Sequence, residues 1–156
     1  MLHQLANDYK VADIIQLSHP YPQTLAKEWI ASHPGLITSG KEYPFAVIEK
    51  GSGILAGTIA LRIHETQKKG DLGYWIGSRF GGRGYAADAV NQLLTIGFES
   101  LTLHKIEAIA LSKNKATIAV LKKAGLAWEA HLKDHLFINQ TYEDAECYCM
   151  SQSSYI

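Results

Sequence analysis

Residues 71–90 read DLGYWIGSRFGGRGYAADAV, and this stretch decides the fold. It passes from an apolar, strand-like segment ending at Gly77, through a glycine-rich turn, into the start of a helix. Glycines let the backbone turn tightly with its N–H groups exposed, and the helix adds unpaired N–H groups and its positive dipole end. An ordinary tight turn is the alternative, but the strand-to-helix context favours a phosphate or pyrophosphate site.

Upstream of this stretch, the pattern predicts a hairpin. Residues 45–48 are a short apolar run, Gly51-Ser52-Gly53 turns the chain, and residues 54–63 continue in strand-like composition. With residues 71–77 this gives three antiparallel strands in sequence order. Before them, Val11 to Leu17 and a segment starting near Thr24 carry apolar residues at helical spacing. The amino-terminal part is therefore predicted to be two helices.

Downstream, the clearest helix has one apolar face, made by Ala86, Ala89, Val90, Leu93, Leu94, Phe98 and Leu101. A strand at 105–111, a helix over 115–124 ended by Gly125, and strands at 127–137 and 141–150 follow. The strand, helix, strand order from residue 71 to residue 111 predicts a parallel crossover. The fold class is α/β (α+β) in one domain, residues 1–156, with a loose tail from residue 151.

The composition excludes several classes of partner. Fifteen basic side chains balance 15 acidic ones, so we expect no nucleic-acid or membrane partner. The amino terminus lacks a secretory pattern and no run approaches roughly 20 apolar residues, which predicts a cytoplasmic protein. Cys147 and Cys149 lie two apart in a predicted strand, where buried thiols are favoured over a redox or metal role.

Two other phosphate motifs compete for the turn. Residues 82–87 fit the G-x-G-x-x-A form of a dinucleotide fingerprint, which normally follows the first strand of a parallel sheet. Here the motif follows three antiparallel strands, and the acidic candidate Glu107 lies near the start of its strand. A Walker-type loop is absent, because no Gly-Lys-Ser or Gly-Lys-Thr triplet closes the turn.

Read from Arg79, the turn is R-x-x-G-x-G, and here the sequence resembles the GNAT N-acetyltransferase superfamily, whose acetyl-CoA loop is Q/R-x-x-G-x-G/A. The segments at 71–76, 82–86, 98–99 with 103–108, 121–126 with Asn114, and 142–144 are similar to the RimJ/RimL branch in the same order. The resemblance covers residues 43–150 well. It implies a mostly antiparallel sheet of six to seven strands with a splayed parallel central pair, flanked by about four helices.

The resemblance also implies the ligand. Acetyl-CoA would lie in the split between the parallel strands, pairing like an added strand. The residues matched to its binding are Trp75, Ile76, Gly77, Arg79, Gly81, Gly82, Arg83, Gly84, Tyr85, Ala86, Asn114 and Lys123. Asn114 would also cap the helix after it. Lys113, Lys115 and Lys122 are further candidates for the outer phosphate, although clustered lysines are commonly a solvated face.

Acyl transfer needs a neutral amine, so a base or water chain must remove a proton. Asp71 stands where related enzymes place a glutamate and is the candidate base, with an exposed structural carboxylate as the alternative. A backbone N–H near Ile76 is the candidate oxyanion donor. Leu121 replaces the tyrosine acid of many superfamily members, and Thr117 matches the serine hydroxyl of the RimJ/RimL branch. A helix-surface hydroxyl bonded to its own backbone is the alternative for Thr117.

Three functions remain open: acetylation of a protein amino terminus, acetylation of a small amine, and an acyl-CoA or nucleotide sensor without catalysis. We expect no metal, because His131 and His135 fall on a strand without the helical i, i+4 spacing. By the family resemblance we expect a homodimer. The chain departs from the family at its start, because it begins almost directly in helical sequence where the family usually opens with a strand, so we expect the sheet to lack one edge strand. Trp29, Tyr74 and Tyr142 are candidates for an interface or the acceptor cleft.

Overall fold

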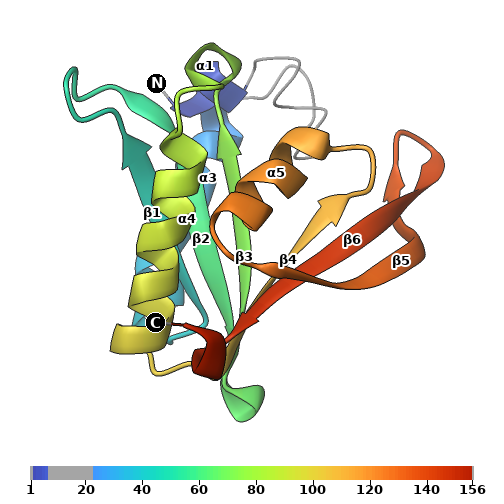
Figure 1. The fold of residues 1–156 in the computed structure, drawn as a ribbon. Coiled ribbons are helices and arrows are strands. Elements are labelled where there is room, and N and C mark those ends of the chain that lie inside the picture. The colour runs from blue at the N-terminus through green and yellow to red at the C-terminus, as the bar shows by residue number, and fades with distance from the viewer. Residues whose placement is uncertain (1, 7–22, 156) are drawn as a thin grey trace.

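A computed structural model describes residues 2–6 and 23–155. Within them six strands form one sheet, in the order β1-β2-β3-β4-β6-β5 (Figure 1). The strands are β1 (Glu42–Ile48), β2 (Leu55–His64), β3 (Lys69–Ile76), β4 (Lys105–Leu111), β5 (Ala127–Ile138) and β6 (Thr141–Ser151). The α-helices are α1 (Leu2–Ala6), α3 (Gln23–Thr38), α4 (Tyr85–Thr95) and α5 (Lys115–Lys123).

The sheet has the predicted pairing. β1, β2 and β3 run antiparallel in sequence order, and β4, β6 and β5 form a second antiparallel group. β3 and β4 are the parallel pair that joins the two groups. In Figure 1 the β5–β6 hairpin leans away from β1, β2 and β3, so the sheet opens from its centre. The prediction of a mostly antiparallel sheet with one parallel central pair is confirmed.

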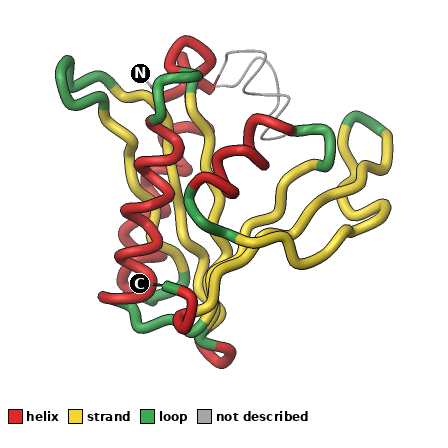
Figure 2. The backbone as a smooth tube through the Cα atoms, in the orientation of Figure 1, coloured by secondary structure: helices red, strands yellow, loops and turns green. Residues whose placement is uncertain are grey.

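Helices cover both faces of the sheet. α4 and α5 lie in front of it and α3 lies behind it (Figures 1 and 2). The apolar face of α4 supplies Val90, Leu93 and Leu94 to the main core, where they meet Leu61 and Ile106 of the sheet. Leu93 is 1% exposed, and truncating such a side chain costs roughly 2–5 kcal/mol. The packing of α4 therefore fixes the position of the glycine-rich turn that precedes it.

The predicted long helix changes character near its end. α4 ends at Thr95, and the chain continues through a π-helical turn, Ile96–Ser100, in which the Leu101 N–H donates to the Ile96 carbonyl at 3.0 Å. Gly97 lies so close to β4 that an added Cβ would be 2.4 Å from Ile106 Cδ1. The wider turn brings the backbone against the sheet, which periodicity alone does not predict.

The two ends of the chain differ from expectation. The helix starting near Thr24 is confirmed as α3 and is longer than predicted, whereas the helix over Val11 to Leu17 lies outside the described residues. At the carboxyl end, a 3₁₀ turn follows β6, and Tyr155 stacks on Phe98 with ring centroids 4.9 Å apart. The prediction of a loose tail is wrong up to Tyr155, because this aromatic ring packs against the main core.

Candidate active site

The central feature is a fork between β3 and β4. The two strands pair only at their beginnings, where Lys69, Gly70 and Asp71 lie beside Lys105, Ile106 and Glu107. Farther along, β3 remains paired with β2 through Ile76, and β4 remains paired with β6 through Leu111. A gap therefore opens between two strands that each keep their other neighbour, as the resemblance implied.

The backbone of β3 offers hydrogen-bonding groups to this gap. The Gly77 N–H donates to the Ala56 carbonyl at 2.8 Å, so the main-chain groups of Gly77 face β2. These groups alternate in direction along an antiparallel pair, which turns those of Ile76 and Tyr74 toward the gap. An extended ligand can pair with them as an added strand would.

Two adjoining cavities occupy this region. The larger, of about 450 Å³, is lined by Tyr74, Trp75, Ile76, Gly77, Ser78, Phe80, Gly81, Gly82, Gly84, Tyr85, Ala86, Ala87, Asn114, Ala116, Thr117, Ala119, Val120 and Lys123. The smaller, of about 280 Å³, lies between the parted strands, from Leu72, Gly73 and Tyr74 on β3 to Ala108, Ile109, Ala110 and Leu111 on β4. Tyr74, Asn114 and Thr117 line both. Of the residues predicted as catalytic or cofactor-binding, Asp71, Arg79 and Arg83 line neither cavity, and neither do Lys113, Lys115 and Lys122, the further candidates for the outer phosphate.

The glycine-rich turn presents a row of free donors. Gly82 and Gly84 have φ of 73° and 85°, left-handed values that favour glycine. The hydrogen bond at the start of α4 runs from the Asp88 N–H to the Gly84 carbonyl. Within the described residues, the N–H groups of residues 82–87 have no acceptor in the protein. Successive exposed N–H groups at the positive end of a helix are an arrangement that proteins commonly use to bind anions.

The two arginines of the turn point elsewhere. The Arg79 guanidinium lies over the Phe80 ring, 4.6 Å from its centroid. Arg83 Nη1 lies 3.3 Å from Glu49 Oε1, and the Tyr85 hydroxyl donates to the same oxygen. These contacts tie the turn to the β1–β2 connection. In this conformation Arg79 and Arg83 offer an anion only their backbone groups. Their guanidinium groups would have to change rotamer to reach it.

One face of α5 closes the larger cavity. Asn114 caps the helix as predicted, with its Oδ1 accepting from the Thr117 N–H at 3.1 Å. The sequence indicated Thr117 and Lys123 here, but Ala116, Ala119 and Val120, which line the same cavity, were not predicted. Residues 116, 119, 120 and 123 follow the i, i+3, i+4, i+7 pattern of a single helix face. That spacing, with small side chains, was the available signal.

Asp71 lies at the fork, on the sheet face away from α5. Successive strand residues point to opposite faces, so Asp71, Gly73 and Trp75 share one face, while Tyr74 points to the other. Asp71 Oδ2 is 2.6 Å from His64 Nε2, and its Oδ1 is buried without a hydrogen-bond partner among the described residues. An added Cβ on Gly73 would meet no atom of the described residues within 4 Å. The surface between Asp71 and Trp75 is therefore open.

Tyr74 and Thr117 meet where the two cavities join. Burial raises the pKa of the Tyr74 phenol, and a side-chain hydrogen bond with Thr117 opposes that rise. Leu121, in place of the usual tyrosine, is 1% exposed within the main core. Tyr74, which the sequence suggested only for a cleft or an interface, is thus a cleft residue.

A second group of polar side chains lies on the sheet at β4, β5 and β6. Ligand atoms of Glu107, Glu129 and Cys147 fall within 4.8 Å of one another. Lys105 Nζ is 2.7 Å from Glu129 and 3.9 Å from Glu107, so both carboxylates already have a cationic partner. Burial raises the pKa of the Cys147 thiol to about 11, which disfavours the thiolate that a metal would bind.

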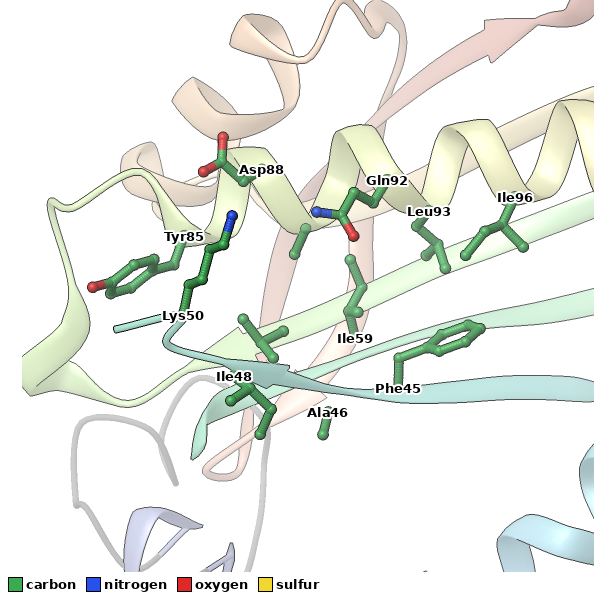
Figure 3. Close-up of a pocket in the computed structure, with 12 residues that line it drawn as sticks. Phe45, Ala46, Ile48, Lys50, Ile59, Tyr85, Asp88, Gln92, Leu93 and Ile96 are labelled. Atoms are coloured by element: carbon green, nitrogen blue, oxygen red, sulfur yellow. The ribbon is translucent and has the colours of Figure 1, made fainter. Parts of the chain in front are cut away.

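Another cavity, of about 440 Å³, lies between β1 and α4 (Figure 3). Its walls are mostly apolar, with Phe45 and Ile59 from the sheet and Leu93 and Ile96 from the helix. Tyr85 is its one predicted site residue. This cavity is separate from the fork and carries no constellation of reactive side chains.

Comparison with known proteins identifies the class that this fold and fork define. The GNAT acetyltransferase domain model matches residues 1–127, and the chain belongs to this family of acyltransferases. "Putative ribosomal N-acetyltransferase YdaF" of Bacillus subtilis (strain 168) is 29% identical over 133 residues, covering 83% of this chain and 68% of that protein. Spermidine N(1)-acetyltransferase of Vibrio cholerae serotype O1 (strain ATCC 39315 / El Tor Inaba N16961) is 28% identical over 111 residues, covering 70% and 64%. The chain thus spans about two thirds of each relative's length.

Solved structures agree with this assignment. Spermidine N-acetyltransferase from Vibrio cholerae, in complex with CoA and spermine, superposes with a TM-score of 0.82 at 25% identity, covering 98% of this chain and 89% of that one. Ribosomal-protein-S5-alanine acetyltransferase from Vibrio fischeri gives 0.85 at 21% identity over 99% and 88%, which shows the shared fold. Among the described residues, no helix has the length and apolar character to cross a membrane.

Proposed function

We propose that this chain is an acetyl-CoA-dependent N-acetyltransferase of the RimJ/RimL-like branch that acetylates a primary amine in a ternary complex. The observation that carries the proposal is the continuity of the glycine-rich turn with the β3–β4 fork. Free N–H groups of residues 82–87 lie at one end of the larger cavity, and the parted strands lie at the other. This arrangement suits a ligand with an anionic diphosphate and an extended thioester arm.

Each group of residues in this site would bind a particular part of acetyl-CoA. The turn and the amino terminus of α4 would hold the diphosphate, and Lys123 at the cavity rim would meet a further phosphate. The main-chain groups of Tyr74 and Ile76 would pair with the amide-containing arm. The Ile76 N–H, turned toward the gap, would stabilise the oxyanion, an effect often worth roughly 3 kcal/mol.

The acceptor amine would approach from the opposite face of the sheet. Gly73 leaves that face open beside the gap, and Asp71 lies on the same face with a buried, unpartnered oxygen. Asp71 would take the amine proton through water, with His64 holding the carboxylate in place. Thr117, on the helix side, would hydrogen-bond the departing sulfur.

The compartment and assembly are parts of the same proposal. Cys147 and Cys149 are both free thiols, as is usual in the cytoplasm. The acceptor is either a protein amino terminus or a small amine, and a homodimer would follow the family resemblance. Relatives that act on spermidine and on a ribosomal protein make both acceptor classes worth testing.

A screen of amines tests the proposal directly. The chain is incubated with acetyl-CoA and either spermidine, spermine or peptides with free amino termini. Thiol release is followed together with the mass of the acceptor, which must rise by one acetyl group. Transfer to any acceptor supports the proposal. Tight CoA binding without transfer would favour a sensor, and heat protection by NAD but not by CoA would favour an oxidoreductase.

A further inference from the structure

The acyl transfer ends with a sulfur that needs a proton, and the usual donor is missing. Leu121 stands in its place with a buried aliphatic side chain. Thr117 can accept or share a hydrogen bond, but an aliphatic hydroxyl is a far weaker acid than a phenol. A phenol has a pKa near 10, close to the roughly 8.5 of a thiol, so proton transfer between them is nearly balanced. The donor is therefore expected to be a tyrosine.

Tyr74 meets the geometric requirements among the described residues. It lines both the larger cavity and the gap between β3 and β4, and it lies on the helix-facing side of the sheet. Tyr85 also lines the larger cavity, but its hydroxyl donates to Glu49 beside the glycine-rich turn. The Tyr74 hydroxyl instead is paired with Thr117 at the junction of the two cavities.

We infer that Tyr74 is the general acid that protonates the CoA sulfur, with Thr117 orienting its phenol. This inference rests on the proposed function and assigns the acid of that reaction. The amine nitrogen bonds to the thioester carbon, and the carbonyl electron pair moves to the oxygen. When the intermediate collapses, the C–S bond breaks, sulfur keeps the bonding pair, and the Tyr74 Oη proton passes to it. The amide nitrogen loses its extra proton to Asp71 through water, and the tyrosinate regains a proton from solvent.

The arrangement places acid and base on opposite faces of the sheet. Asp71 and Gly73 face the acceptor side, and Tyr74 faces α5. The pairing of β3 with β4 ends at Asp71, so the gap beyond it connects the two faces of the sheet. An amine on the Asp71 face can therefore reach a thioester that Tyr74 approaches from the other face. Burial raises the pKa of the Tyr74 phenol and keeps it protonated at neutral pH, while the side-chain hydrogen bond with Thr117 opposes that rise and so favours proton donation.

The test compares Tyr74→Phe with the unchanged protein and with Tyr155→Phe. Tyr155 is a matched control, because its hydroxyl hydrogen-bonds Thr95 and Glu99 near the carboxyl end, away from the fork. We expect Tyr74→Phe to lower kcat by about 100-fold, with little change in the KM for acetyl-CoA. Tyr155→Phe should retain the unchanged protein's kcat. In a cycle with Thr117→Val, the two losses should not add, because the hydroxyls act together.

A binding measurement gives a readout that does not need turnover. The ultraviolet absorbance of the thiolate of bound CoA is titrated against pH in each variant. With Tyr74 beside the sulfur, the bound thiol should ionise at lower pH than in Tyr74→Phe. Should Tyr74→Phe fail to fold, fluorotyrosine at position 74, whose phenol is more acidic, should shift the same titration downward.

The outcomes separate this inference from the proposed function. Absence of transfer by the unchanged protein would overturn the proposed function, and the CoA titration would still report whether Tyr74 contacts sulfur. If the unchanged protein transfers acetyl groups while Tyr74→Phe matches it in kcat and in the titration, Tyr74 is not the acid. A loss that appears only in the KM for acetyl-CoA would also overturn the inference. It would mean that Tyr74 lines the cavity that binds acetyl-CoA and donates no proton.

Discussion

The two edges of β4 behave differently. Along one edge β4 is paired with β6 from Lys105 to Leu111, whereas along the other it is paired with β3 only as far as Glu107. The β6 edge is further fastened beyond the strand end, where the Ser112 hydroxyl donates to Glu146. The β3 edge opens onto cavities. One strand therefore serves as structure on one side and as the wall of a binding site on the other.

The difference teaches where stability and function can be separated. Changes along the open edge should alter binding and chemistry while the fold persists. Changes along the closed edge should alter stability while binding persists.

Asp71→Asn, at the point where the strands part, should reduce kcat by about 100-fold, the scale of a lost general base. The amide keeps the size of the side chain, so the melting temperature should change little. Steady-state kinetics across pH checks this. The ionisation of the catalytic base should be absent from the pH profile of kcat in Asp71→Asn. If Asp71→Asn keeps the kcat of the unchanged protein, Asp71 is a structural carboxylate and not the base.

Gly84→Val should weaken CoA binding by roughly 30-fold, since a side chain at its positive φ costs about 2 kcal/mol. Calorimetric titration with CoA measures the loss. Gly40→Val is the matched control, because Gly40 has φ of 69° and lies in the turn between α3 and β1, away from the fork. Equal losses of CoA affinity in the two variants would contradict the anion site at the turn.

Gly73→Val should raise the KM for the amine about tenfold, on the scale of a modest steric conflict. A Cβ added at Gly73 lies within 4 Å of no atom in the part of the chain that the structure describes. CoA affinity should remain unchanged, since Gly73 faces away from α5. The two constants are measured separately, and a change in CoA affinity alone would place the acceptor elsewhere.

Glu146→Gln, on the closed edge, should lower the melting temperature by a few degrees and leave CoA binding intact. Glu146 accepts from Trp128 Nε1 at 2.8 Å, is 2.7 Å from His131 Nδ1, and accepts from Ser112 at 2.9 Å. Together these lower its pKa to about 2, with the Trp128 bond the largest cause. A carboxylate with a lowered folded pKa stabilises the fold above its unfolded pKa, and this stability is lost as pH falls.

Melting curves between pH 6 and pH 2 measure this effect, with Glu99→Gln as a control carboxylate near the carboxyl end. The difference between Glu146→Gln and the unchanged protein should shrink as the pH falls from about 4.5 toward about 2. A difference independent of pH would assign the stabilisation to packing instead of charge.

Much of this molecule was predictable because its signals are local. The glycine-rich turn, the strand before it and the apolar face of α4 are all read within a few residues of sequence. Asn114 as a helix cap is equally local, since its partner is the N–H three residues later. Such features depend on backbone conformation and periodicity, which neighbouring residues largely determine.

The remaining features depend on contacts between distant segments. Gly97 reads as an ordinary helical glycine until β4 is packed against it. The position of Tyr74 beside Thr117 depends on how α5 crosses β3, and the orientation of Arg83 depends on Glu49, 34 residues earlier. Tyr155 gave no signal because its stacking partner, Phe98, belongs to another element.

The short pairing of β3 with β4 has a mechanical consequence. Two antiparallel half-sheets meet through the backbone of Lys69–Asp71 and Lys105–Glu107, so the sheet has a natural hinge. A ligand that hydrogen-bonds along the gap would link the two half-sheets and restrict their motion relative to each other. Amide exchange at Tyr74 and Ile76 should therefore slow sharply on ligand binding, while exchange along the β4–β6 edge should hardly change.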